Sequence, residues 1–397
     1  MAETRKASRF VVPVAVAGVA AATIGLVPAL AASGDPDLPE ITARQLIEKI
    51  AASDTQTLSG TFRITTDLGL PSLGGLASGL GGLDGGSSTA DPSAKLTELV
   101  TGSHTLRVAA DGPERQRLTL LDGSDEYSLI HNGDDVWAYD SKSNEAFHEK
   151  GASGAGEKDE PLPGTPKQLA DEVLKAAGDT TSITVDGTAK VAGRDAYQLV
   201  IKPKQSGSTV ESVKIAVDAA NGTPLKFTLS SVEGGKPVVD AGFTKVDFGK
   251  PAASEFTFEA PKGAKVTEGG AEKGDGAAKD LPEGFEGGIP GLGEILGDSG
   301  PGKAFGDSGS GEGPDVIGEG WTTIAKLDTG APAAGTDGAP KEIQGFLDSF
   351  GDKVTGKFGS GTVFKTKLVN ALLTEDGRVY VGAVTKDALV DAANAGE

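Results

Sequence analysis

Apolar and polar residues alternate with a period of two in one short segment after another between residues 58 and 268. The first of these segments reads SGTFRITTDL, and later ones read HTLRVAADG, RQRLTLLDG, EYSLIHNG and DVWAYDS. Successive side chains of a strand point to opposite faces of a sheet, so the pattern indicates half-buried strands. So many short strands at near-regular spacing predict an α+β, mainly β fold, with one curved antiparallel sheet or a half-open antiparallel β-barrel.

Two amphipathic helices are expected to cover this sheet. Residues 38–55 carry apolar residues at helical spacing, and Thr42 suits the helix N-cap. Residues 165–177 show a second apolar face, with Gly178 directly after it. Tight turns are expected where residues that tolerate positive φ adjoin, at Asn132-Gly133, Asp186-Gly187, Gly193-Arg194 and Asn221-Gly222.

The N-terminus has the composition of an export signal. Basic residues precede an apolar run over residues 10–32, and the small residues at its end suit cleavage near Ala31 or Ala32. The run also reaches the length of about 20 apolar residues that spans a bilayer, so residues 1–32 are either a signal peptide or a retained anchor. Either way, we expect the rest of the chain outside the cytoplasm, secreted or associated with the cell envelope.

The chain contains no cysteine, so an exported protein of this kind holds its fold without disulfides. Its formal net charge of −20 disfavours nucleic acid and anionic lipid surfaces as partners. We expect a monomer without a cofactor.

Two glycine-rich stretches divide the remaining chain. Residues 68–86 read LGLPSLGGLASGLGGLDGG and interrupt the strand pattern, so they are an insertion within a domain. Residues 269–314 are predicted to be a disordered, acidic linker, because ordering so many glycines is entropically costly. The leucines of the insertion leave two interpretations open, a flap that covers an apolar groove and a disordered surface loop.

Residues 315–397 are predicted to form a small α+β module. It contains a helix candidate at residues 343–354, a hairpin turn at Asp376-Gly377 and a short helix that begins near Lys386. Its size is near the lower limit for independent stability. The module is therefore expected to dock on the first domain or on a partner.

Catalytic and metal-binding patterns are weak. Cysteine is absent, and His104, His131 and His148 lie singly on strands or turns, which indicates neither a zinc site nor a nucleophile with its base. Residues 297–303 and 351–357 both read G-x-x-x-x-G-K, but neither is followed by the hydroxyl residue that holds Mg²⁺ in a phosphate-binding loop. We expect no enzyme, no catalytic residue and no metal site.

Three stretches resemble a known family. The segment VAGRDAYQLVIKP (residues 191–203) with VKIAVDAANGTPLKFTL (residues 213–229) resembles the central strands of LolA-type and RseB-type domains. The ending FTKVDFGKPAASEFTFEAPKGAKV and the stretch NGDDVWAYDSKSNEAF (residues 132–147) are similar to other parts of that domain. Residues 38–268 therefore resemble the LolA/RseB lipid-binding domain, in an actinobacterial type with an additional C-terminal module.

The resemblance implies an extracytoplasmic carrier or chaperone that holds lipid or lipoprotein acyl chains against an apolar concave sheet face. An RseB-like envelope sensor, which binds lipid or lipoprotein and regulates a membrane-anchored anti-sigma factor, is the alternative. A structural or adhesive secreted protein is a third interpretation.

The residues expected to line the groove are the apolar members of one strand face. A slip of one residue in the assumed parity of a strand would move its whole set to the other face. Packing into an ordinary core is the competing interpretation for each of them. They are Phe62, Ile64, Leu106, Leu118, Trp137, Tyr139, Tyr197, Leu199, Ile201, Ile215, Phe227 and Leu229.

Overall fold

The computed structural model describes residues 35–69, 102–150, 171, 174, 175, 177–269, 315–328 and 351–396. The expected export segment, nearly all of the insertion and nearly all of the linker lie outside the described residues. Of the second expected helix, only residues 171, 174, 175 and 177 are described, and each is helical. No helix among the described residues is long and apolar enough to cross a membrane.

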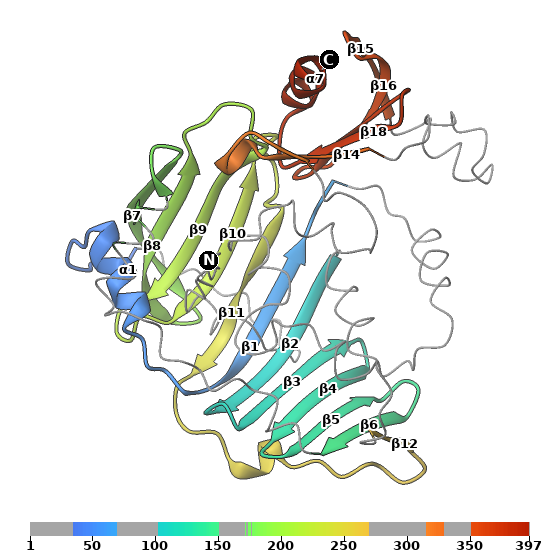
Figure 1. Cartoon of the computed structure of the whole chain (residues 1–397). Coiled ribbons are helices and arrows are strands. Elements are labelled where there is room, and N and C mark those ends of the chain that lie inside the picture. The colour runs from blue at the N-terminus through green and yellow to red at the C-terminus, as the bar shows by residue number, and fades with distance from the viewer. Residues whose placement is uncertain are drawn as a thin grey trace, which may run out of the picture.

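A single twelve-stranded sheet makes up the main domain (Figure 1). Its order is β12-β6-β5-β4-β3-β2-β1-β11-β10-β9-β8-β7, and all neighbours are antiparallel except β12 and β6. The strands are β1 (Thr57–Thr66), β2 (Gly102–Asp111), β3 (Arg115–Asp122), β4 (Asp125–Asn132), β5 (Asp135–Asp140), β6 (Glu145–Lys150), β7 (Thr181–Val191), β8 (Arg194–Pro203), β9 (Val210–Asp218), β10 (Pro224–Ser231), β11 (Val239–Asp247) and β12 (Lys265–Gly269).

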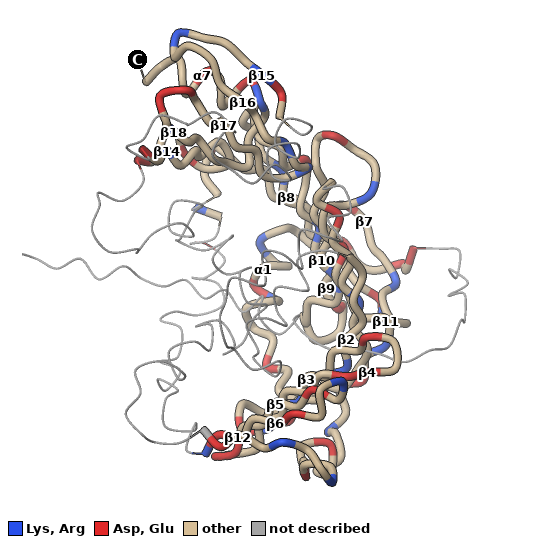
Figure 2. The backbone as a smooth tube through the Cα atoms, turned by 90° about the vertical axis from the view of Figure 1, so that its right-hand side faces the viewer, with Lys and Arg blue, Asp and Glu red and all other residues tan. Residues whose placement is uncertain are grey.

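The sheet is curved and does not close, because its two edge strands, β12 and β7, do not pair with each other. Figure 2 shows it as an arc that opens to one side. This arrangement confirms the predicted half-open antiparallel barrel. One expected turn was wrong: Asp186-Gly187 does not end a strand but lies in a bulge of β7, between the pairs of Val185 and Thr188.

Helix α1 (Ala43–Ala51) lies inside the arc. Thr42 caps it as predicted, with a capping box in which Thr42 and Gln45 satisfy each other's backbone amides. Its apolar face, Leu46, Ile47 and Ile50, is buried against β7 to β10. The helix therefore identifies the concave face as the one that carries the core.

The C-terminal unit is a six-stranded sheet of order β13-β14-β18-β17-β16-β15, with helix α7 packed on it. The predicted hairpin at Asp376-Gly377 and the predicted final helix are confirmed. The helix candidate at residues 343–354 is wrong where it is described, because residues 351–354 belong to β15. The elements are β13 (Asp315–Ile317), η5 (Gly320–Thr322), β14 (Ile324–Asp328), β15 (Gly351–Gly356), β16 (Gly359–Phe364), β17 (Asn370–Thr374), β18 (Arg378–Gly382) and α7 (Lys386–Ala395).

This unit docks on the end of the main sheet at the β8–β9 connection. Backbone hydrogen bonds run from Thr209 N to Ala383 O (3.0 Å) and from Thr385 N to Gly207 O (2.7 Å). The pairing of Ser208 with Val384 is an antiparallel bridge between the two sheets. The sequence left open whether this unit docks on the first domain or on a partner, and the structure shows it docked on the first domain.

Candidate functional site

The strand register places most of the expected groove residues on one face. Phe62 pairs with Leu106 and with Phe243, and Leu106 in turn pairs with Leu120. Because paired residues point to the same side, the face can be followed from strand to strand across the sheet. Ten of the twelve expected residues share the face on which α1 lies, namely Phe62, Ile64, Leu106, Leu118, Tyr197, Leu199, Ile201, Ile215, Phe227 and Leu229.

The half of this face formed by β7 to β10 is occupied by α1. The three buried helix residues pack with the strand residues of this half, and the Tyr197 hydroxyl donates to Pro39 O at 3.0 Å. Six of the expected groove residues belong to this cluster or pack against it: Tyr197, Leu199, Ile201, Ile215, Phe227 and Leu229. Because this cluster also contains the buried residues of α1, it favours the ordinary-core interpretation for these six.

The other half of the concave face, on β11 and β1 to β5, carries most of a second apolar cluster, which also includes Val191, Ala196, Ala216 and Leu225 of β7 to β10. Phe62 is 1% exposed and meets Phe243 edge to face, with ring centroids 5.1 Å apart. Leu118 and Phe147 are half-buried and pack against the same cluster. Among the described residues, no helical residue belongs to this cluster. We call it the strand-only half of the concave face.

Trp137 and Tyr139 lie on the opposite, convex face, so the expectation that they line the groove with the others is corrected. Their strand neighbour Ala138 pairs with Leu129 and Phe147 and thus occupies the concave side. Trp137 and Tyr139 instead contact Phe258, with ring centroids 5.2 and 5.3 Å away. Both faces of β5 are therefore apolar, and the bulkier side chains point away from the groove.

His148 lies beside this convex aromatic cluster and stacks on Trp137, with ring centroids 3.8 Å apart. Its Nε2 is 2.9 Å from Asp135 Oδ1 and its Nδ1 is 2.9 Å from Glu268 Oε2. These contacts join β5, β6 and β12 and use both ring nitrogens. In the part of the chain that the structure describes, no group of three or more His, Asp or Glu residues is arranged to hold a metal ion.

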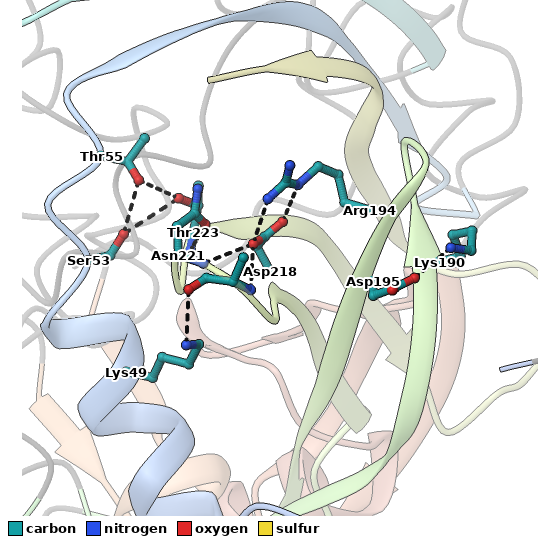
Figure 3. Close-up of polar contacts among 10 residues, drawn as sticks. Lys49, Ser53, Thr55, Lys190, Arg194, Asp195, Asp218, Asn221 and Thr223 are labelled. Atoms are coloured by element: carbon teal, nitrogen blue, oxygen red, sulfur yellow. Dashed lines mark hydrogen bonds and ion pairs between the residues drawn. The ribbon is translucent and has the colours of Figure 1, made fainter. Parts of the chain in front are cut away.

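The motif residues that carry the family resemblance join two neighbouring hairpins at one end of the sheet, which we call its base (Figure 3). Arg194 Nε donates to Asp218 Oδ2 at 2.5 Å and its Nη2 donates to Oδ1 at 3.0 Å, which makes a bidentate pair between the β7–β8 and β9–β10 hairpins. The Asp218 side chain is 1% exposed. Burial raises the pKa of Asp218, but the Arg194 guanidinium and the amides of Asn221 and Ala220 outweigh burial, so this pKa is lowered.

Helix α1 is attached to the same hairpin. Lys49 Nζ donates to Ala220 O at 3.3 Å, and Thr55 and Thr223 share a hydrogen bond of 2.9 Å. Gly222 has a φ of +77°, and a Cβ at this position would lie 2.4 Å from Lys49 O. The Asn-Gly turn is therefore required both by its backbone conformation and by the close approach of α1.

The sequence did not predict which residues lie at the end of the concave face nearest the C-terminal unit. Leu68, which follows β1, and Leu368 and Trp321 of the C-terminal unit pack against the α1 cluster. Lys367 N donates to Leu68 O at 2.8 Å, and Lys367 Nζ is 2.7 Å from Asp67 Oδ2. The hydrogen bond from Lys367, together with the Gly69 amide, lowers the pKa of Asp67. These residues are far apart in sequence, so only the docking of the two sheets brings them together.

Comparisons with known proteins give likenesses of structure only. No family model matches the chain, and no curated protein matches it. The chain is similar to the Pseudomonas aeruginosa MucA/MucB complex structure, with 15% identity, a TM-score of 0.37 and coverage of 88% of this chain and 96% of that chain. It is also similar to a LolA superfamily protein from Nitrosomonas europaea, with 12% identity, a TM-score of 0.20 and coverage of 55% and 99%.

An uncharacterised conserved protein from Thermus thermophilus is similar at 11% identity, with a TM-score of 0.31 and coverage of 57% of this chain and 98% of that chain. With TM-scores below 0.5, these likenesses carry no information on what this chain binds.

Proposed function

We propose that the chain is an extracytoplasmic carrier that binds the acyl chains of lipids or lipoproteins on the strand-only half of its concave face. The observation that carries the proposal is the continuous apolar stripe on β11 and β1 to β5 of an unclosed sheet. The basic and apolar N-terminal sequence supports export. Binding and release by exchange, without covalent chemistry, are sufficient for this role.

The chemistry of the stripe favours an aliphatic ligand. Its members are aliphatic or phenylalanine side chains with a single tyrosine, Tyr127. An apolar ligand gains roughly 0.8 kcal/mol for each methylene that it moves from water to such a surface. A flexible acyl chain can follow several neighbouring strands, whereas a polar ligand would lose its hydrogen bonds to water there without replacement.

An envelope sensor would use the same groove and differ in its partner. Chemical cross-linking in intact cells separates the two roles, because a carrier exchanges cargo with several proteins. Recovery of one membrane-spanning regulator in an amount comparable to the chain itself would contradict a pure carrier.

Leu118 and Val266 offer a pair of substitutions for testing the groove, because Leu118 packs against the apolar cluster whereas Val266, on the edge strand β12, does not. We expect Leu118→Gln to weaken binding of a fluorescent fatty acid by about tenfold, since it removes one apolar side chain from the groove. Val266→Gln should leave the affinity within about twofold of the wild type, because the Val266 side chain is 40% exposed and does not pack against the cluster. Equal effects of the two substitutions, or no binding by the wild-type chain, would contradict the proposed site.

A further inference from the structure

The C-terminal unit supplies part of the concave side of the main sheet. Leu368 and Leu68 are adjacent, because Lys367 N donates to Leu68 O at 2.8 Å, and both pack against the α1 cluster, which is formed by α1 and β7 to β10. Val239 pairs with Thr66 at the same end of the sheet. It packs against both the α1 cluster and the apolar cluster of the strand-only half. Leu68 follows the last residue of β1 by two positions, so it lies with Leu368 at the end of β1 where Val239 joins the two clusters.

The turn that carries Leu368 is fixed from several directions. Thr209 Oγ1 donates to Leu368 O, and Leu368 N donates to Thr366 Oγ1 at 3.1 Å. Asn370, which is 3% exposed, donates from its Nδ2 to Val384 O at 2.7 Å and accepts from Thr366 N. Both backbone groups of Leu368 are thus hydrogen-bonded, and the partner of its carbonyl is Thr209 in the β8–β9 connection.

The ion pair between Lys367 and Asp67 fixes the other side of this contact. Asp67 also accepts from Gly69 N at 3.1 Å, and its own backbone amide donates to Val238 O at 2.8 Å. The segment that follows β1 is therefore tied both to the residue that precedes β11 and to the C-terminal unit. A ligand that lies along β1 meets this segment at the end of β1 nearest the C-terminal unit.

We propose that Leu368 and Leu68 form an end wall that sets the longest acyl chain the groove accommodates. The inference rests on the proposed binding function and assigns the C-terminal unit a role in chain-length selectivity. Each methylene that is buried raises affinity roughly fourfold. Affinity should therefore rise with chain length until the terminal methyl group reaches the wall, and then level off.

The test is a binding series of saturated fatty acids from decanoate to stearate, measured by competition against a fluorescent fatty acid with the full chain. Leu368→Ala shortens the wall and should move the plateau to longer chains. Leu368→Phe should move it to shorter ones. Val369→Ala is the matched control, because Val369 is the next residue of the same turn and is 40% exposed. It should reproduce the wild-type plateau.

The possible failures are distinguishable. If the wild-type chain binds none of the fatty acids, the proposed function itself is contradicted. If it binds them and both Leu368 variants keep the wild-type plateau, the groove remains and the end wall is wrong. The two Leu368 substitutions shift the plateau in opposite directions, so a general loss of stability, which weakens all chain lengths together, does not imitate the expected result.

Discussion

Replacement of Arg194 by methionine tests whether the motif residues hold the base of the sheet. The substitution leaves the Asp218 carboxylate, 1% exposed, without its guanidinium partner. Breaking a buried ion pair by removing one partner costs about 3–5 kcal/mol. The amides of Ala220 and Asn221, at 2.8 and 3.0 Å from Asp218 Oδ1, remain in place. We therefore expect the lower end of that range, about 3 kcal/mol.

The same hairpin provides the control. Lys190 and Asp195 form an ion pair whose side chains are 43% and 45% exposed, as Figure 3 shows beside the buried pair. Exposed pairs contribute about 0–1 kcal/mol, so Lys190→Met should have a small effect. With urea m-values of about 1–3 kcal/mol/M, Arg194→Met should lower the unfolding midpoint, followed by far-UV circular dichroism, by about 1–3 M.

A second substitution separates the charge from the packing. Asp218→Asn in the Arg194→Met background keeps an oxygen that accepts from the turn amides but removes the buried charge. We therefore expect it to restore part of the lost stability. If Arg194→Met lowers the midpoint no more than Lys190→Met does, the buried pair does not hold the hairpins and the reasoning is refuted.

The pH dependence of this effect has a definite sign. The pKa of Asp218 is lower in the folded state than the unfolded value of about 3.9. The stability that the pair contributes is therefore fully present above the unfolded pKa and is lost as the pH falls through the lowered pKa. The difference between wild type and Arg194→Met should be largest at neutral pH and shrink in acid.

Two further substitutions test the attachment of α1 and of the C-terminal unit. Gly222→Ala should destabilise the chain by more than about 2 kcal/mol, because it adds a clash with Lys49 O to the cost of positive φ, whereas Gly133→Ala, with open space around it, should cost about 1–2 kcal/mol in the same urea titration. Asp67→Asn should cost at most about 1 kcal/mol at neutral pH, because its ion pair with Lys367 is partly exposed. The cost should disappear as the pH falls through the lowered pKa of Asp67, because wild-type Asp67 is then protonated and uncharged as well. A cost that persists unchanged in acid would contradict this assignment.

Sequence patterns predicted the sheet and most of its faces because alternation is a local property of each strand. Thr42 and the apolar spacing after it likewise identified α1. Alternation failed at β5, where the segment that contains Phe256 and Phe258 covers the convex face and makes both faces apolar. Trp137, with the larger side chain, was therefore predicted to line the groove, whereas it lies on the convex face.

Long-range contacts had no comparable local signal. The docking of the two sheets depends on backbone groups of residues 207–209 and 383–385, and any residue type can supply these. The division of the concave face depends on where α1 lies, which the sequence of the strands does not contain. For the same reason, the wall residues Leu68 and Leu368 could be found only from the structure.

Covalent capture of a ligand tests the central claim most directly. The full chain is incubated with a palmitate analogue that carries a photoreactive group on its acyl chain, irradiated and digested, and the labelled peptides are identified by mass spectrometry. We predict labels on β1 to β4, around Leu106 and Leu118, that decrease when unlabelled palmitate competes. Labels confined to the convex face around Trp137, or labels that palmitate does not displace, would contradict binding on the concave face.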